Sequence, residues 1–94
     1  MSLTERMAEW VEANKARLED LDRAFFRESK DDREKPSAHL VLEQGERFVD
    51  AIVWDSGEVE LSFGTANEPC DEHHEIDSSS ELDELLTRLV EMVE

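Results

Sequence analysis

Apolar residues recur from Leu3 onward at alternating steps of three and four residues, with Asn14 filling one place. This spacing matches the period of an amphipathic α-helix, and Ser2 followed by Glu5 is typical of a capping box at its start. Pro36 ends a run without apolar residues and disfavours helical geometry at the residue before it. The pattern therefore predicts a helix within residues 1–30 and a linker over 31–36. The apolar stripe of this helix consists of Leu3, Met7, Trp10, Val11, Leu18, Leu21 and Phe25.

The segment 37–63 is rich in β-branched and aromatic residues, and polar turn residues interrupt it at 44–45 and 55–57. These features predict an antiparallel meander of three strands. Asp-Ser-Gly at 55–57 is typical of a three-residue hairpin turn with Gly57 at positive φ, which places Val53 opposite Val59. The core face predicted by strand alternation consists of Ala38, Leu40, Val49, Ala51, Val53, Val59, Leu61 and Phe63.

The opposite face of the predicted sheet mixes apolar and acidic side chains. The sequence leaves open whether a helix covers it, because a sheet can be covered on both sides. If it is uncovered, Trp54 and its aliphatic neighbours, ringed by carboxylates, have the composition of a hot spot for a partner with a basic rim and an apolar centre. The candidate partner-binding residues are Phe48, Asp50, Ile52, Trp54, Asp55, Glu58, Glu60, Asp71 and Glu75.

The C-terminal part predicts a short fourth strand and a closing helix. After a loop over 64–71, the segment 72–76 has the length of a strand that would point His73 and His74 to opposite faces. Ser78 and Glu81 match a capping box, and leucines at helical spacing follow over 78–94. The predicted fold is one α+β domain over 1–94: a helix, an antiparallel sheet of three or four strands within 37–77, and a second helix, with both helices packed on the sheet.

Charge is distributed unevenly along the 94 residues, whose net charge is −16. Residues 1–36 hold eight basic and ten acidic side chains, whereas residues 37–94 hold two and sixteen. A field of this sign repels nucleic-acid phosphates and attracts basic protein surfaces. No apolar run reaches the roughly 18 residues of a membrane span, and the start lacks a signal-peptide pattern. With a single cysteine, Cys70, that cannot form an internal disulfide, these features predict a cytoplasmic protein without nucleic-acid or membrane partners.

Six consecutive residues, 70–75, are of types that can ligate a metal ion. Strand alternation would separate His73 from His74, and His39 would have to come from another strand. The chain contains no Cys-x-x-Cys or His-Glu-x-x-His pair, no nucleophile elbow and no phosphate-binding glycine loop. The sequence therefore predicts no metal site, no cofactor and no catalytic residue. A metal-dependent enzyme using the three histidines remains an alternative hypothesis.

Four short motifs follow one another between Ala38 and Leu89. They are Leu42-Glu43, the hairpin from Trp54 to Glu58, the acidic strand from Glu72 to Glu75, and the serine-capped helix start from Ser78 to Leu86. In this order, after an amphipathic helix in a small acidic chain, they resemble the TriTu family of bacterial polymorphic-toxin immunity proteins. The resemblance implies a cytoplasmic antidote, encoded beside a toxin, that neutralises the toxin by stoichiometric binding. It assigns no individual residue to toxin contact.

Taken together, the sequence and the resemblance predict a non-catalytic protein that captures a basic toxin domain, for example a nuclease, through the acidic C-terminal two-thirds of the chain. Trp54 and its neighbours are the expected anchor. A small acidic secretion chaperone that binds an effector segment is the second hypothesis, and it predicts a stable dimer. The sequence leaves the toxin's identity open, as well as the choice between monomer and dimer.

Overall fold

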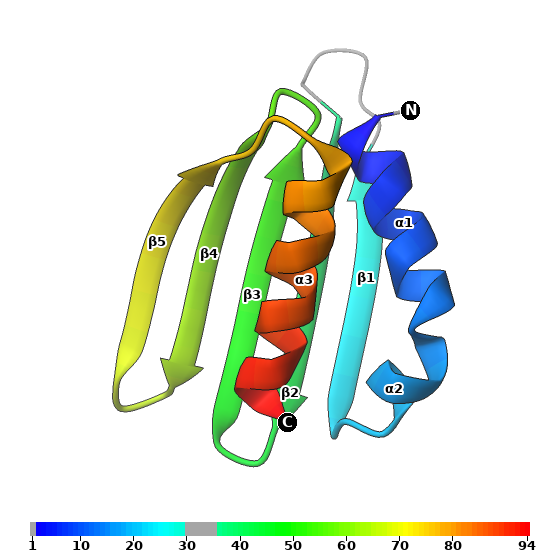
Figure 1. Cartoon of the computed structure of the whole chain (residues 1–94). Helices are drawn as coiled ribbons and strands as arrows, with labels where there is room; N and C mark the ends of the chain where they lie inside the picture. Colours follow the sequence, from blue (N-terminus) through cyan, green and yellow to red (C-terminus); the bar gives the residue numbers. More distant parts are fainter. Residues whose placement is uncertain (1, 30–35) are drawn as a thin grey trace.

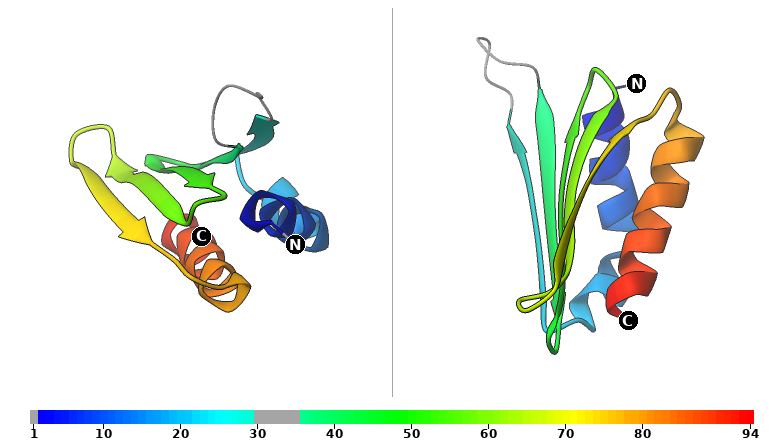
Figure 2. Two further views of the ribbon diagram at one scale, coloured as in Figure 1. Left: turned by 90° about the horizontal axis from the view of Figure 1, so that it is seen from above. Right: turned by 90° about the vertical axis from the view of Figure 1, so that its left-hand side faces the viewer.

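The computed structural model describes residues 2–29 and 36–94. The five strands form one antiparallel sheet in the order β1-β2-β3-β4-β5 (Figure 1), and the helices all lie on one face of it (Figure 2). This arrangement confirms the predicted α+β fold, with five strands in place of three or four. The elements are α1 (Leu3–Ala13), α2 (Lys15–Glu19), β1 (Arg23–Ser29), β2 (Ser37–Gln44), β3 (Arg47–Trp54), β4 (Glu58–Thr65), β5 (Pro69–Glu75) and α3 (Ser79–Val93).

The hairpin between β3 and β4 has the predicted register. Val53 pairs with Val59, and the pairing continues at steps of two along the core face. Gly57 has φ 99°, and its N–H donates to the Trp54 carbonyl over 2.9 Å. The predicted core face is buried under the helices, except that Phe63 is only partly buried, and Leu42 joins it. The short polar turn therefore determined which side chains form the core.

The turn between β2 and β3 is shifted by one residue from the prediction. Gln44 pairs with Arg47, so the two-residue turn is Gly45-Glu46, with positive φ only at Gly45. The pairing consequently differs by two residues from that expected for a Gln44-Gly45 turn. Because side chains alternate with a period of two, the same residues of β2 still face the core.

The prediction that the first helix continues to residues 27–30 was wrong in its C-terminal part. The helix is interrupted at Asn14, between α1 and α2, and ends at Glu19. Arg23–Ser29 forms β1, which pairs with β2 from Arg23 opposite Glu43 to Ser29 opposite Ser37. A strand at this position gains cross-strand pairing that an isolated helical end lacks, so tertiary context outweighs the local period. The predicted linker, apart from Pro36, lies outside the described residues.

Serine caps begin the two longer helices as predicted. The Ser2 hydroxyl accepts from the Glu5 N–H and the Ser78 hydroxyl accepts from the Glu81 N–H, each over 3.2 Å. The Glu81 carboxylate accepts from the N–H of Asp77, one residue before the cap. The buried faces of both helices meet the sheet, and this layer is the core. Its helical members are Met7, Trp10, Leu18, Leu82, Leu86, Leu89, Val90 and Val93.

Two arginine–carboxylate pairs join the N-terminal helices to the C-terminal part of the chain. Arg6 on α1 donates to both oxygens of Asp83 on α3, over 3.1 and 2.5 Å. Arg17 on α2 donates to both oxygens of Glu94, over 2.9 and 2.6 Å. The bidentate pairing raises the pKa of each arginine and lowers that of Glu94. These contacts join helices that lie side by side on one face of the sheet.

Candidate protein-binding surface

The second face of the sheet, the open face, carries none of the helices formed by the described residues (Figure 2). Strand register places on it the odd-numbered residues of β1, β2 and β5 and the even-numbered residues of β3 and β4. The question that the sequence left open is thereby answered, because the helices cover the other face only. The large apolar side chains of the open face are Phe25, Val41, Phe48, Ile52 and Trp54.

Eight of the nine residues predicted for partner binding lie together on the open face. Four of them alternate along β3, and Glu60 on β4 lies directly opposite Ile52. On β5, Glu75 lies opposite Glu58, and Asp71 lies opposite Ser62. Phe48, Ile52 and Trp54 are half-buried by their neighbours in the sheet, whereas the acids on β5 are exposed. The surface thus has an apolar strip on β3 and an acidic border on β4 and β5.

Asp55 lies apart from the other eight residues. It belongs to the β3–β4 turn, and its Oδ1 accepts a hydrogen bond from the main-chain N–H of Thr4 over 2.9 Å. Thr4 is buried at the start of α1, where N–H groups lack partners within the helix. Asp55 therefore ties the turn to the helix layer and is not part of the open face.

Polar contacts orient several carboxylates of the open face. The His39 Nε2 and an Asp50 oxygen are 2.6 Å apart, as are the His73 Nδ1 and a Glu60 oxygen. The pKa of His73 is raised, chiefly by the hydrogen bond to Glu60. Desolvation lowers this pKa by a smaller amount, and the negative charges of Glu60, Glu75 and Glu58 raise it further. These contacts hold carboxylates in place beside the apolar strip.

Formal charge changes sign across the open face. Arginines lie at the β1 side, whereas carboxylates lie along the remaining strands. The Arg23 Nη1 is 3.8 Å from the Glu43 Oε2 on the neighbouring strand β2. An arrangement of this kind can bind a protein whose cationic side chains meet β4 and β5. The six carboxylates are those of Glu43, Asp50, Glu58, Glu60, Asp71 and Glu75, and the two guanidinium groups are those of Arg23 and Arg27.

Sequence reasoning missed the β1 residues of this surface, because it assigned them to a helix. Phe25 is 42% exposed on the open face, whereas Phe26 packs against the core from the other side of β1. Adjacent residues of a strand point to opposite faces, so two neighbouring aromatic residues fit a strand better than a one-sided helical stripe. That signal favoured a strand at Phe25 and Phe26, whereas Asn14 marks only the end of α1.

The histidines do not converge on one site. His73 and His74 lie on opposite faces of β5, and two strands separate His39 from His73. His74 is 2.8 Å from Glu72 on the side of the helices. Within residues 2–29 and 36–94, no three histidine, cysteine or acidic side chains form a group suited to a metal ion. Nor is any helix of this described part long and apolar enough to span a membrane.

The fold and the open face define a two-layer α+β protein that presents an acidic surface with an apolar strip. A family model described as Immunity protein TriTu matches residues 5–92. The chain therefore belongs to the TriTu family of immunity proteins. Searches of curated proteins and of solved structures gave no match. Membership of an immunity family assigns the chain to toxin neutralisation through binding of a cognate toxin, a function that is generally non-catalytic.

Proposed function

We propose that this immunity protein neutralises its toxin by binding a basic toxin domain, such as a nuclease, through the open face. The observation that carries the proposal is the side-by-side placement of the β3 apolar strip and the carboxylates of β4 and β5 on a face that none of the described helices covers. Family membership indicates that the partner is a toxin. The negative charge of the open face indicates that the toxin's contact surface is basic.

Trp54 is the proposed anchor of the contact. It lies half-buried at the end of β3, on the same face as Ile52 and Phe48. A partially buried tryptophan can place a large apolar area against a partner with little loss of side-chain freedom, since its position is already restricted. The carboxylates of the acidic border then surround the contact and exclude water from its centre.

The acidic border also suggests how a nuclease would be inactivated. Nucleases bind phosphates through cationic side chains. The carboxylates of Glu58, Glu60, Asp71 and Glu75 can form ion pairs with the same cationic side chains. Binding there blocks access of the nucleic acid without any reaction on the immunity protein. The proposed location of this encounter is the cytoplasm.

The experiment is a protection assay in cells that produce the toxin encoded beside this chain. The variant Trp54→Ala/Glu58→Ala/Glu60→Ala removes the anchor and two carboxylates, and we expect it to lose protection. The matched control, Met92→Ala/Glu84→Ala/Glu91→Ala, removes one exposed apolar side chain and two carboxylates from α3 on the other side of the molecule. Full protection by the first variant, at equal protein level, would contradict the proposal.

A further inference from the structure

The two edges of the sheet differ in how they are protected against another strand. The β5 edge begins with Pro69 and carries charged side chains on both faces, as edge strands that avoid pairing commonly do. The β1 edge also carries charged side chains, Arg23, Arg27 and Glu28, but it has no proline and has Phe25 and Phe26 at its centre, and no described strand lies beyond it. An exposed aromatic edge is a site where an extended peptide can add a strand.

The register identifies the main-chain groups that face outward from β1. The Asp55 N–H donates to the Pro36 carbonyl over 3.1 Å, so even-numbered residues of β2 pair by hydrogen bonds with β3. Because this pairing alternates along a strand, the odd-numbered residues of β2 bond to the odd-numbered residues of β1. The N–H and C=O groups of Ala24 and Phe26 consequently point to the outer edge.

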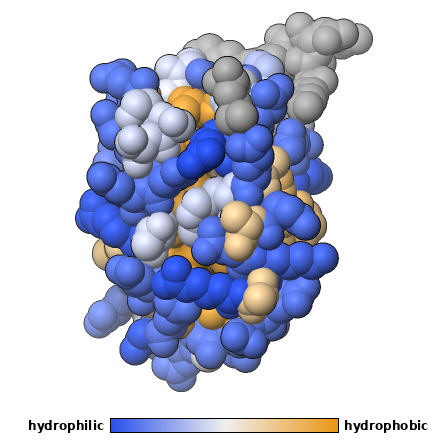
Figure 3. All heavy atoms as spheres, turned by 45° about the vertical axis from the view of Figure 1, so that its right-hand side comes forward, coloured by the Kyte–Doolittle hydropathy of each residue, from blue (hydrophilic) through white to orange (hydrophobic). Residues whose placement is uncertain are grey.

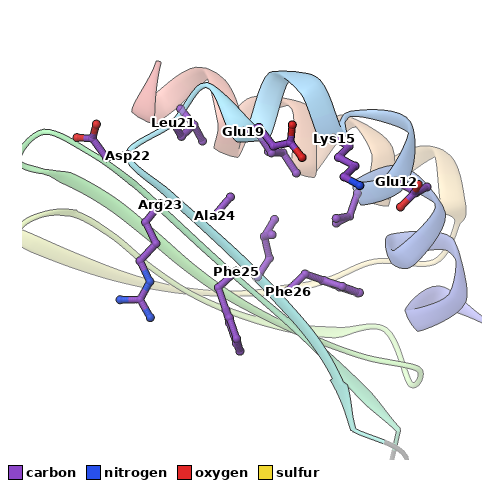
Figure 4. Close-up of a pocket in the computed structure, with 12 residues that line it drawn as sticks. Glu12, Lys15, Glu19, Leu21, Asp22, Arg23, Ala24, Phe25 and Phe26 are labelled. Atoms are coloured by element: carbon purple, nitrogen blue, oxygen red, sulfur yellow. The ribbon is translucent and has the colours of Figure 1, made fainter.

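A groove of about 330 Å³ lies beside this edge, between β1 and the N-terminal helices. Figure 4 shows Ala24 and Phe26 on the side of the helices and Arg23 and Phe25 on the opposite side of the strand. In Figure 3, on this side of the molecule, apolar side chains lie at the bottom of hollows between hydrophilic ones. The apolar residues that line the groove are Val11, Leu18, Leu21, Ala24, Phe25, Phe26 and Leu40.

We propose that an extended segment of the toxin adds to β1 as a sixth strand and places an apolar side chain in this groove. The inference rests on the proposed function and names a second part of the same contact. Main-chain pairing with Ala24 and Phe26 would provide affinity, and the groove would select an apolar residue at one position of the segment.

Charge indicates the chemistry of that segment. Two arginines and one glutamate give β1 a net charge of +1, whereas three acids give β5 a net charge of −3 with its histidines neutral. The segment at β1 is therefore neutral or acidic on the side of Arg23 and Arg27, while the toxin's basic surface meets β4 and β5. A second copy suits this edge less well, because its own arginines would approach these two and two chains of charge −16 repel each other.

The test uses the full chain and the catalytically inactivated toxin domain encoded beside it. Ala24→Pro removes the outward N–H but leaves the bonds between β1 and β2, since proline is tolerated at that position of an edge strand. Ala24→Ser keeps the N–H and is the matched control. We expect affinity to fall at least about tenfold for the proline variant and to change less than about twofold for the serine variant.

A second measurement on the unmodified chain does not depend on the proline variant folding. Amide exchange at Ala24 and Phe26 should slow by at least about tenfold when the toxin domain binds. Unchanged exchange at both amides in a complex that still depends on Trp54 would overturn this inference and leave the proposed function standing. Absence of any binding would overturn both. Protection of these amides that rises with the concentration of the free chain would identify a second copy as the occupant and would also overturn the inference.

Discussion

Gly57 is a residue at which backbone geometry restricts the sequence closely. Its φ is 99°, and a Cβ added there would lie 2.4 Å from the main-chain oxygen of Ile76. Gly45 also has positive φ, at 61°, but a Cβ there would meet nothing within 4 Å. We expect Gly45→Ala to lower the free energy of unfolding by roughly 1–2 kcal/mol and Gly57→Ala to lower it by more. Urea unfolding of both variants checks this, and equal losses would contradict it.

His73 should titrate above its ordinary pKa of 6.5, because it shares a hydrogen bond with Glu60. A raised folded-state pKa means that this contact stabilises the fold fully below the ordinary value and that the stabilisation is lost as pH rises through the raised value. Glu60→Gln should return the His73 pKa toward 6.5 in an NMR titration. Glu72→Gln, which alters the partner of His74, is the control. An unchanged His73 titration in Glu60→Gln would count against the assigned cause.

At the scale of single elements, the cap of α3 is the contact that most directly determines where that helix begins. The Ser78 hydroxyl accepts from the Glu81 N–H, and α3 supplies five buried core residues. Ser78→Ala should lower the free energy of unfolding by about 1 kcal/mol. Ser80→Ala, at an exposed position within the first turn of the helix, should change it by less than roughly 0.5 kcal/mol. Similar denaturation midpoints for the two variants would show that the cap contributes little.

The strands β3 and β4 were predictable because their pattern and their turn agree. Asp55-Ser56-Gly57 admits few turn geometries, and β-branched residues alternate on either side of it. The strand β1 was not predictable in the same way. Leu21 and Phe25 continue the helical stripe, and only pairing with β2 makes Arg23–Ser29 a strand. Hydrogen bonding to a neighbouring strand leaves no periodic signal within the segment itself.

At the scale of the whole molecule, the open face depends on where both helices pack. The sequence shows that α1 and α3 are amphipathic, but either face of the sheet could have received each of them. The two helices lie on the same face, where residues distant in the sequence, such as Arg6 and Asp83, contact each other. Most residues of the candidate surface could therefore be named from the sequence, whereas their exposure together and the addition of Phe25 required the fold.

The net charge of −16 predicts that the toxin associates under electrostatic steering. Raising the ionic strength from about 0.05 to about 0.5 M should slow association roughly tenfold or more, because the screening length shortens well below the size of the acidic border. Stopped-flow association rates measure this effect. The Trp54→Ala/Glu58→Ala/Glu60→Ala variant should show a shallower salt dependence, and an association rate independent of salt would contradict an electrostatic role for this face.

The stoichiometry and affinity of toxin binding show whether the open face holds the toxin. Calorimetric titration of the inactivated toxin domain into the unmodified chain should give one toxin per immunity protein. The Trp54→Ala/Glu58→Ala/Glu60→Ala variant should bind about 100-fold more weakly, whereas the α3 variant Met92→Ala/Glu84→Ala/Glu91→Ala should stay within about threefold of the unmodified chain. Unchanged affinity in the open-face variant, with weakened binding in the α3 variant, would place the toxin on the helices and contradict the account.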